Sequence, residues 1–485
     1  MTANNTSSAQ SSRQSEPEDF DIVILGGGTG STVAAWTFAG QGQRVAVVDR
    51  KYIGGSCPNI ACLPSKNIIQ SARVASYIRH SKDYGITTNG FTVDMSGVRG
   101  RKRDMVTGLN DLYRENYTKT GAEFILAPGR FVAPKTIEAT LPGGATRLLR
   151  GANVIISTGT HATVEPIPDL VESQPLTHIE ALELDRLPQH LIVLGGGYVG
   201  LELAQAMRRF GSKVTVVEHN AQIVSREDDD VTDALCALFK DDGIEVLLGA
   251  RVKRVSGKSG ESVKIALEQN GAEKILQGSH ILVATGRTPN TAGLGLETAG
   301  VELTDRGFIK VNDRLQTTAP GVWALGEVAG SPQFTHVSID DFRVIRDNLA
   351  GGNHTTTHRL IPFCLFTDPE LARIGLSEKD AAAQGIAYRL FKVPMEANLR
   401  ARTLSETRGF MKALVEVASD RILGFTIFGV DGGETMAVVQ MAMIAGLPYT
   451  AIRDAIIAHP TLAEGLEALF GSQPTAQNQS HRATP

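Results

Sequence analysis

The 485-residue sequence lacks the features of several large classes of protein. Its formal net charge at pH 7 is only −4, and no stretch interleaves aromatic with basic side chains, so we expect no nucleic-acid partner. No apolar run approaches the roughly 18 residues that a membrane-spanning helix needs. The first 20 residues are polar and contain no signal-peptide core. We therefore expect no membrane segment.

Cysteine is also scarce, with only four residues in the chain. This small number favours a reducing compartment, so we expect a cytoplasmic protein. We predict no metal site. The length suits about three domains, and the 42% hydrophobic content allows each a core.

Two of the four cysteines, Cys57 and Cys62, lie five positions apart. Lys66 follows Cys62 by four positions. A cysteine near a helix N-terminus or a cation ionises easily, and the thiolate is the reactive form. Five steps on a regular helix place two side chains roughly 140° apart, so bonding between them requires a distorted first turn. Proline at position 58 suits such a turn. Taken alone, this spacing fits a structural disulfide or two core cysteines as well as a redox-active pair.

The preceding residues predict a dinucleotide-binding unit. An apolar strand over Asp21–Leu25 leads into a glycine-rich turn and a helix that continues to Ala39. A glycine turn at a helix N-terminus binds a pyrophosphate, and a second strand, Arg44–Val48, ends at an acidic residue suited to a ribose. The ligand residues we expect here are Gly26, Gly28, Gly30, Ser31 and Asp49. Ser31 replaces the usual small third residue, glycine or alanine.

The same pattern occurs a second time. A strand over Leu191–Leu194 leads into a complete G-x-G-x-x-G, and the next strand, Lys213–Val217, ends at an acidic residue. Gly26 to Asp49 spans 23 steps (49 − 26), and Gly195 to Glu218 also spans 23 (218 − 195). Two dinucleotides are therefore expected. The second set of ligand residues is Gly195, Gly197, Tyr198, Gly200 and Glu218.

The position of the cysteines indicates which cofactor each copy binds. Cys57 follows Asp49 by eight residues, so the first dinucleotide should carry the ring that exchanges electrons with sulfur, which predicts FAD. The second copy should bind the nicotinamide dinucleotide. Glu218 would bind a ribose hydroxyl and repel a 2′-phosphate, which favours NAD over NADP, although His219 and Arg226 lie close by in the chain.

These residues resemble the FAD-dependent pyridine nucleotide-disulfide oxidoreductases, which include dihydrolipoamide dehydrogenase, glutathione reductase and mercuric reductase. The resemblance spans about residues 20 to 470 and rests on the cysteine segment and on five further motifs. These are Gly195–Glu202, Ala284–Asn290, Val322–Glu327, Phe366–Glu370 and His459–Glu464.

The resemblance implies the catalytic residues. Cys57 would be the thiol that meets substrate, and Cys62 the thiol against the flavin. Lys66 would lie near the flavin, paired with Glu202, because a buried ammonium needs a partner. His459 and Glu464 would form an acid-base pair for a thiol, with the histidine completing the active site of the other subunit of a homodimer.

The resemblance also implies cofactor residues. Tyr198 would be an aromatic gate that nicotinamide displaces, with an ordinary core tyrosine as the alternative. Glu327 replaces the family's usual aspartate at the flavin ribityl chain, and His336 would open a helix, Val337–Leu349, that faces the flavin pyrimidine. The predicted FAD set also includes Gly159 and Gly326, and Gly286 joins the NAD(P) set.

The substrate stays open at this stage. We predict electron flow from nicotinamide through flavin and the cysteine pair to a thiol or disulfide substrate such as lipoamide, or the reverse. The alternatives are a mercuric, cupric or quinone reductase and, less favoured, a flavoprotein that senses redox state without turnover. Pro58 and Ala61 depart from the family's redox motif. Cys236 and Cys364 sit in apolar contexts that predict small buried side chains.

The predicted fold is α/β, with two Rossmann-like dinucleotide-binding domains and a C-terminal α+β dimerisation domain. We expect a discontinuous FAD domain over 19–160 and 280–352, an NAD(P) domain over 161–279 and a dimerisation domain over 355–471. Polar tails are expected over 1–18 and 472–485. Alternating segments at Ala387–Val393, Gly409–Val417 and Arg421–Phe428 predict antiparallel strands, and Glu434–Ala445 and Tyr449–Ala458 predict helices. The charged stretch Gly100–Thr118 predicts a solvated helix face.

Overall fold

A computed structural model of the chain describes residues 16–476. The predicted tails over 1–18 and 472–485 lie mostly outside these residues. Of their described parts, Glu18 already begins strand β1, Glu18–Leu25, and Thr475–Ala476 form strand β22, which pairs with β19, Tyr388–Pro394. Backbone pairing therefore makes these positions strand residues rather than tail.

The chain folds into two compact units. The first contains the described residues up to Asn59 together with Val106–His161 and Thr288–Thr357. The second contains Ile60–Met105, Ala162–Arg287 and the described residues from His358 onward. The three-domain division predicted from the sequence stays a prediction, and each unit is described by itself.

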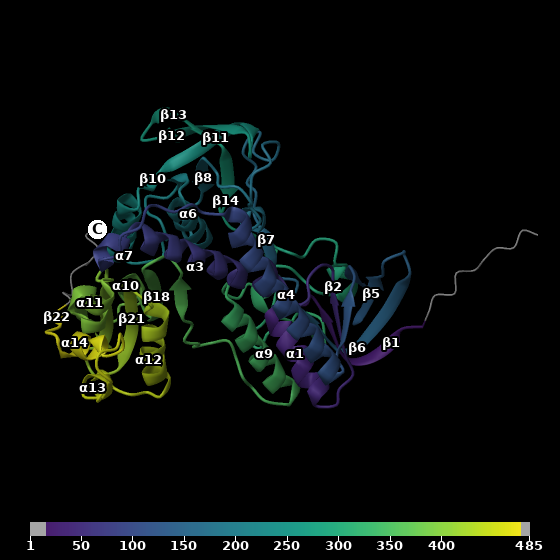
Figure 1. The fold of residues 1–485 in the computed structure, drawn as a ribbon. Helices are drawn as coiled ribbons and strands as arrows, with labels where there is room; N and C mark the ends of the chain where they lie inside the picture. The colour runs from purple at the N-terminus through teal and green to yellow at the C-terminus, as the bar shows by residue number, and fades with distance from the viewer. Residues whose placement is uncertain (1–15, 477–485) are drawn as a thin grey trace, which may run out of the picture. The chain divides into compact units, whose positions relative to one another are not determined.

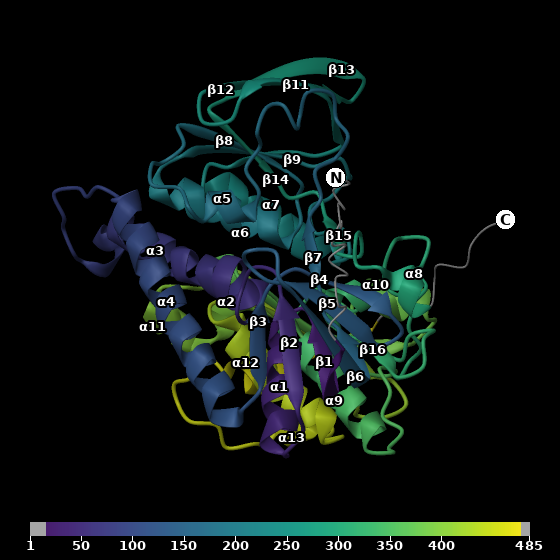
Figure 2. The same cartoon turned by 90° about the vertical axis from the view of Figure 1, so that its right-hand side faces the viewer.

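The first unit is built on a seven-stranded mixed sheet (Figures 1 and 2). Its order is β3-β2-β1-β6-β5-β4, and β16 also pairs with β6. The parallel part contains β1, β2 (Val45–Asp49), β3 (Glu123–Leu126), β6 (Thr146–Ile156) and β16 (Val322–Ala324), while β4 (Gly129–Ala133) and β5 (Thr136–Thr140) add antiparallel strands. The strands predicted at 21–25 and 44–48 are thus confirmed to within a few residues.

Both faces of this sheet are buried at the carboxyl ends of its central strands, which is why these ends, Ile22–Leu25 of β1 and Val154–Ile156 of β6, are apolar. Ile22 and Ile24 of β1 join one hydrophobic cluster, and Val23 and Leu25 join another, because successive side chains point to opposite faces. Helices α1, Thr29–Gly40, and α9, Thr335–Leu349, contribute Phe38 and Phe342 to the first cluster, with ring centroids 5.7 Å apart.

The second unit contains a four-stranded parallel sheet of order β10-β9-β8-β14. Its strands are β8 (His190–Leu194), β9 (Lys213–Val217), β10 (Glu245–Leu247) and β14 (His280–Val283), with helices α6 (Tyr198–Phe210) and α7 (Asp229–Asp241) in the connections. The antiparallel strands β11 (Ala250–Lys258), β12 (Ser262–Gln269) and β13 (Ala272–Gly278) form a separate sheet. Helix α3, Cys62–Arg79, packs on α6.

A six-stranded antiparallel sheet of order β17-β18-β21-β20-β19-β22 completes the second unit. Its further strands are β17 (Phe363–Leu365), β18 (Glu370–Gly375), β20 (Phe410–Glu416) and β21 (Ile422–Gly429), which confirms the predicted antiparallel segments. Helices α12 (Gly432–Ile444), α13 (Tyr449–Arg453) and α14 (Gly465–Gly471) contribute to its core. The helix predicted to continue to Ala458 ends at Arg453, because only Tyr449 and Ile452 turn inward and Ile456 is fully exposed.

The charged stretch 100–118 lies within helix α4, Met95–Thr120. The prediction of a solvated stretch is wrong at Tyr117, which is 5% exposed, and at Lys102, which is only 2% exposed. The Lys102 ammonium contacts the carboxylate of Glu183, so the buried charge has a partner.

Within residues 16–476 no helix is both long and apolar enough to cross a membrane. The remaining short elements are α2 (Ser56–Ile60), η1 (Ser81–Tyr84), α5 (His178–Ala181), α8 (Leu296–Ala299), η2 (Gly326–Ala329), α10 (Glu378–Ala383), η3 (Met395–Ala397), α11 (Leu399–Leu404), β7 (Thr160–Ala162) and β15 (Arg287–Pro289).

Candidate active site

The first glycine-rich turn needs glycine at its first position. Gly26 follows β1 with φ +105°, and a Cβ there would lie 2.3 Å from the carbonyl oxygen of Ser157 at the end of β6. No other residue fits this close crossing of two backbone segments. The chain then enters α1 through Gly28, the residue that precedes the helix.

Asp49 at the end of β2 is bonded to this turn. Its Oδ2 accepts the backbone N–H of Gly27 at 2.7 Å, and its Oδ1 accepts the N–H groups of Lys51 and Tyr52 at 2.8 and 2.9 Å. The predicted ribose ligand therefore also fixes the glycine turn. This second role arises because the end of β2 lies beside the glycine turn in the folded chain, and the sequence alone does not predict it.

The second copy repeats the arrangement in register. Gly195 has φ +103°, and a Cβ there would lie 2.4 Å from the carbonyl oxygen of Ala284. Oε2 of Glu218 accepts the N–H of Gly196 at 2.6 Å, while Oε1 accepts the backbone and side-chain N–H groups of Asn220 at 2.7 and 2.8 Å. Glu218 is 5% exposed, and these hydrogen bonds supply the partners that a buried carboxylate needs.

Both turns fit the pyrophosphate of a dinucleotide. Among the described residues, neither α1 nor α6 has a side-chain cap at its N-terminus or an acidic residue in its first turn. The caps are Gly28 and Gly197, and a Cβ at Gly197 would meet no atom within 4 Å. Uncapped amides beside an open glycine suit an anionic ligand, because the helix end carries partial positive charge. The residues present thus fit the pyrophosphate of a dinucleotide in each copy.

The third small positions of the two motifs are filled differently. The Ser31 hydroxyl donates to the carbonyl oxygens of Gly26 and Gly28 at 2.7 and 2.8 Å, and the residue is completely buried. At Gly200 a Cβ would lie 2.4 Å from the carbonyl oxygen of Gly195, so this position has room only for glycine. Position 30 requires glycine because of a neighbouring helix, since a Cβ there would lie 2.3 Å from the carbonyl oxygen of Ser338 on α9.

The remaining residues of the predicted FAD set lie at strand and helix ends of the first unit. Gly159 follows β6 with φ +64°, and Gly326 follows β16 at the start of η2. The Glu327 carboxylate accepts a hydrogen bond from the Thr160 hydroxyl. His336 is the second residue of α9, is exposed, and stacks on Phe334 with ring centroids 5.1 Å apart. Gly286, from the NAD(P) set, follows β14 with φ +139°.

One residue of this region was missed by sequence reasoning. Asp341 of α9 is completely buried, and its Oδ2 accepts the N–H of Gly326 at 2.7 Å. It fixes the turn that carries Glu327. A carboxylate on a buried helix face is a signal for such a role, because a buried charge requires hydrogen-bond partners.

The cysteine segment forms two helices instead of one. Cys57 lies in α2 and Cys62 begins α3, and the break falls at Ala61, with φ −133° and ψ −104°. The predicted distortion between the two cysteines is therefore present. Cys62 lies at the positive end of an 18-residue helix, where negative charge is favoured.

Lys66 and Glu202 meet as predicted. The Lys66 ammonium lies 2.7 Å from Oε2 of Glu202, and it lies over the ring of Phe366 at 4.6 Å from the centroid. Oε1 of Glu202 accepts the N–H of Phe366 at 2.9 Å. The side chain of Glu202 is 6% exposed and that of Lys66 is 31% exposed, so the carboxylate is buried and the lysine side chain is partly buried.

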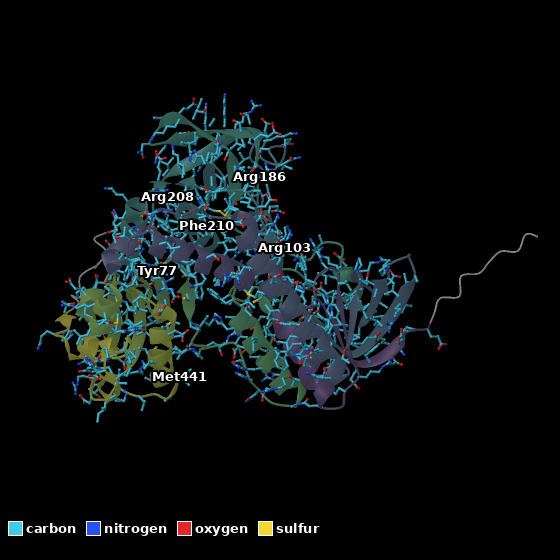
Figure 3. All side chains as sticks on the ribbon, viewed as in Figure 1. Tyr77, Arg103, Arg186, Arg208, Phe210 and Met441 are labelled. Carbon is cyan, nitrogen blue, oxygen red and sulfur yellow. The ribbon has the colours of Figure 1, made fainter. Side chains whose placement is uncertain are left out.

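His459 and Glu464 also meet. His459 Nδ1 lies 2.9 Å from Oε1 and 3.1 Å from Oε2 of the glutamate, which orients the ring with its Nε2 directed away. The His459 side chain is 62% exposed. Exposed apolar side chains occur on nearby elements of the same unit, including Met441 (labelled in Figure 3), Ile444 and Ile456.

Comparison with known proteins decides the family. The family model for pyridine nucleotide-disulphide oxidoreductases matches residues 20–341, and the model for the dimerisation domain of that family matches residues 361–469. The chain is a pyridine nucleotide-disulfide oxidoreductase.

Relatives of this oxidoreductase include enzymes with several substrates. It is 34% identical to the pyridine nucleotide-disulfide oxidoreductase RclA of Escherichia coli, over 93% of this chain and 98% of that protein. It is 33% identical to a dihydrolipoamide dehydrogenase of Chaetomium thermophilum, covering 93% and 90%. It is 30% identical to a mercuric reductase of Bacillus cereus, covering 93% and 70%.

A solved structure shows the same fold. The Cu(II) complex of the HOCl-induced flavoprotein disulfide reductase RclA from Escherichia coli superposes with a TM-score of 0.85 at 33% identity, over 94% of this chain and 99% of that one. The predicted fold class, with FAD and NAD domains and a C-terminal dimerisation domain, is confirmed. The family implies FAD and a nicotinamide cofactor, and the dimerisation domain indicates a homodimer.

In this oxidoreductase the predicted gate residue, Tyr198, begins α6 directly after the second glycine turn. Its hydroxyl donates to Oε1 of Glu227 at 3.1 Å. Burial and the nearby Glu227 carboxylate hold the pKa of Tyr198 far above its ordinary value, so the hydroxyl stays a donor.

The other two cysteines are partly buried, not fully buried as predicted. Cys236 on α7 and Cys364 on β17 each pack against a hydrophobic cluster. Burial raises the pKa of both thiols, and at Cys364 the carboxylates of Glu370 and Glu202 raise it further. Neither environment favours a thiolate.

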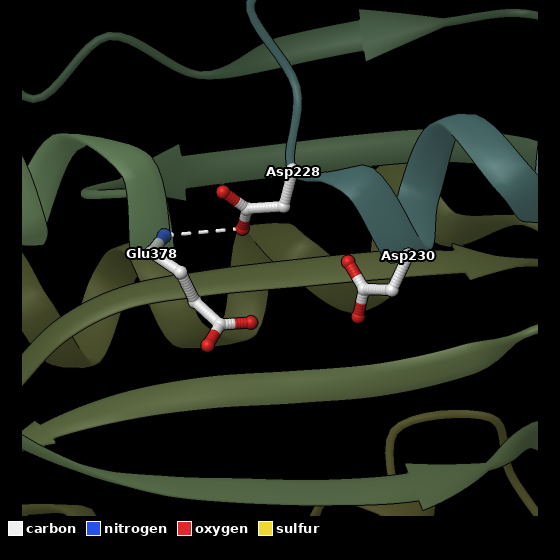
Figure 4. A group of neighbouring side chains, drawn as sticks. All are labelled: Asp228, Asp230 and Glu378. Carbon is white, nitrogen blue, oxygen red and sulfur yellow. Dashed lines mark hydrogen bonds between the residues drawn. The ribbon is translucent and has the colours of Figure 1, made fainter. Parts of the chain in front are cut away.

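A buried lysine was missed by sequence reasoning. Lys412 of β20 is completely buried, and its ammonium lies 2.8, 2.7 and 2.9 Å from carboxylate oxygens of Asp228, Asp230 and Glu378. Figure 4 shows these three carboxylates facing a common space. Three converging carboxylates could bind a cation, and here the ammonium is that cation. Lys412, Glu378 and the neighbouring pair Asp228 and Asp230 come from three distant segments, so no local pattern predicts the cluster.

Proposed function

We propose that this oxidoreductase uses Cys57 and Cys62 as a redox-active pair that exchanges electrons with a thiol or disulfide substrate. The observation that carries the proposal is the placement of Cys62 as the first residue of α3, with Lys66 one turn later and paired to a buried carboxylate. The helix end and the ammonium both favour negative charge on the Cys62 sulfur. Cys57, five residues earlier, is then the thiol that meets substrate.

The chain's residues suit both cofactors of such an enzyme. A bound FAD would accept a hydride equivalent from a nicotinamide and supply two electrons to the cysteine pair. Gly26, Gly28 and Asp49 would hold it, with Glu327 at the ribityl chain. Gly195, Gly197 and Glu218 would hold the nicotinamide dinucleotide. Because the Glu218 carboxylate repels a 2′-phosphate, we propose NAD as the preferred form.

His459 would move the proton. Glu464 fixes the ring through Nδ1, which leaves Nε2 to protonate the departing substrate thiol or to deprotonate Cys57. The ring is exposed on its own chain, and we propose that it acts in the active site of the second subunit of a homodimer.

Reduction of a metal ion is the second candidate. The observation that favours it is the likeness to an RclA solved as a Cu(II) complex and to a mercuric reductase. The same cysteine pair would then bind Cu(II) or Hg(II). Quinone reduction is a further acceptor class for the same electron path.

We further propose the finer organisation and location. The FAD domain would occupy 19–160 and 280–352, the NAD(P) domain 161–279 and the dimerisation domain 355–471. The small number of cysteines supports a cytoplasmic location.

The test is an anaerobic titration of the purified flavoprotein with NADH, followed by reoxidation with disulfides, Cu(II), Hg(II) and quinones. A thiolate-flavin charge-transfer band should appear in wild type and be lost in Cys62→Ser. Cys57→Ser should keep the band and lose disulfide turnover. The matched control is Cys236→Ser, which should behave as wild type. Full turnover with every acceptor in both active-site variants would refute the proposal, and faster NADH oxidation with Cu(II) or Hg(II) than with any disulfide would favour the second candidate.

A further inference from the structure

Glu227 is a buried carboxylate to which neither the family resemblance nor the glycine motifs assign a role. It lies just before α7, on the loop that begins after the predicted ribose ligand Glu218, and it is 2% exposed. Its two oxygens have different partners. Oε1 accepts the Tyr198 hydroxyl at 3.1 Å, and Oε2 accepts Nε of Arg373 at 3.0 Å.

Arg373 is itself held in place on β18. Its Nη1 donates to the carbonyl oxygen of Gly375 at 3.1 Å and to Oδ2 of Asp380 at 3.2 Å. Its guanidinium lies over the ring of Phe363, 4.8 Å from the centroid, and the residue is 7% exposed. Glu227 is therefore tied to the antiparallel sheet and cannot follow a movement of the tyrosine.

The Tyr198 ring cannot leave its described position without breaking the hydrogen bond to Glu227. The acceptor is charged, and hydrogen bonds to charged groups are stronger than neutral ones. The bond also forms inside the protein, where replacement by water is limited because Glu227 is buried. Displacement of the ring therefore has a free-energy cost set by Glu227 and Arg373.

We propose that Glu227 is a positioning residue that holds Tyr198 and thereby sets the affinity of the enzyme for nicotinamide. We call the contact of Tyr198, Glu227 and Arg373 the tyrosine anchor. The inference rests on the proposed function and on the role that the family resemblance implies for Tyr198, an aromatic gate that nicotinamide displaces. The new element is the origin of the resistance: Arg373, on strand β18 of the C-terminal antiparallel sheet, holds Glu227, and Glu227 holds the Tyr198 ring.

The experiment measures flavin reduction by NADH in the holoenzyme, by rapid mixing at several NADH concentrations. Tyr198→Phe keeps the ring and removes the bond, so the apparent Kd for NADH should fall by roughly 10-fold. The limiting rate of reduction is measured in the same runs, so that an effect on NADH binding is separated from an effect on hydride transfer. Glu227→Gln keeps an acceptor but loses the charge, so its Kd should lie between those of wild type and Tyr198→Phe.

The double variant distinguishes a shared contact from two independent effects. If the anchor acts through one bond, adding Glu227→Gln to Tyr198→Phe should change the Kd no further. Tyr388→Phe is the matched control, because the Tyr388 hydroxyl also donates to a glutamate, Glu378, at 3.0 Å in the same unit. It should leave the Kd for NADH unchanged.

An unchanged or raised Kd in Tyr198→Phe would overturn the inference, as would additive effects in the double variant. These results are separable from failure of the proposed function. If wild-type flavin is not reduced by NADH or NADPH, the proposed function fails. If wild type is reduced normally and the variants match it, only the anchor is refuted.

Discussion

The Lys66 ammonium lies 2.7 Å from one oxygen of the Glu202 carboxylate, and the other oxygen accepts the backbone N–H of Phe366 at 2.9 Å. The pair thus links α3, α6 and the residue after β17 within one compact unit. Glu202 is 5% exposed, so loss of either partner leaves a buried charge poorly compensated.

Lys66→Met should lower the free energy of unfolding by roughly 2 kcal/mol, because the Glu202 carboxylate loses a charge-assisted hydrogen bond. Urea denaturation measures this change. Lys66→Arg is the control, since it keeps the positive charge, and it should lose less than half as much. In the reduced protein Lys66→Met should also weaken the charge-transfer band, and a full band would contradict the proposed effect of the ammonium on the Cys62 sulfur.

His459→Gln should lower kcat/KM for a disulfide substrate by about 10²- to 10⁴-fold, the usual range for a lost acid-base group. Turnover of a quinone, which needs no thiol proton transfer, should change little. Glu464→Gln should cause a smaller loss, because the histidine remains but is less firmly oriented. Steady-state assays with both acceptors measure the two losses separately, and His354→Gln, at an exposed histidine, is the control. Equal losses for disulfide and quinone would argue against the acid-base role.

Asp230 should make stability depend on acid pH. Burial alone would raise the pKa of Asp230, but hydrogen bonds from Lys392 and Lys412 outweigh it and hold the pKa below its ordinary value. A carboxyl with a lowered folded-state pKa stabilises the protein above its unfolded pKa of about 3.9, and the effect is lost as the pH falls through the folded pKa.

The stability difference between wild type and Asp230→Asn should therefore be constant from about pH 7 to pH 5 and shrink below about pH 4. Urea unfolding at a series of pH values gives the profile. Asp111→Asn is the control, because its partner Arg114 is an exposed side chain on the same helix, and it should cost under about 0.5 kcal/mol at any pH. A stability difference between wild type and Asp230→Asn that grows toward low pH would contradict a lowered pKa of Asp230.

Two glycines of α1 should respond oppositely to alanine. At Gly30 a Cβ would lie 2.3 Å from the Ser338 carbonyl oxygen, so Gly30→Ala should force α1 and α9 apart and cost about 1–3 kcal/mol. At Gly40 a Cβ meets nothing within 4 Å, and alanine should be neutral or stabilise by up to about 1 kcal/mol. Thermal unfolding and the retained flavin absorbance report both. Equal tolerance at the two positions would contradict the described α1–α9 packing.

The sequence predicted the parts of the site that depend on short stretches of chain. Each glycine turn, its strand and its acidic residue lie within about 25 positions, and the two copies agree in spacing, so the register of Gly26 with Asp49 and of Gly195 with Glu218 could be inferred. The break near Cys57 and Cys62 followed from helix geometry together with the expectation that the two cysteines bond to each other.

The parts that could not be predicted depend on contacts between distant segments. Lys412 lies 184 positions from Asp228, and Arg373 lies 146 from Glu227, while each looks like a surface charge in its own strand. Lys102 was expected on a solvated face for the same reason. Helix α13 ends before Ala458 because only its first turn is buried, and burial is a property of the folded chain.

The Glu218 carboxylate, which we propose as the ribose ligand that favours NAD, also holds the turn at Gly196. Glu218→Ala or Glu218→Lys would remove both carboxylate oxygens, of which one accepts the N–H of Gly196 and the other that of Asn220, so the glycine turn should loosen. A successful redesign toward NADPH would have to rebuild that turn with a second substitution. Under the proposed preference for NAD, coenzyme choice and the rigidity of the glycine turn both depend on the Glu218 carboxylate.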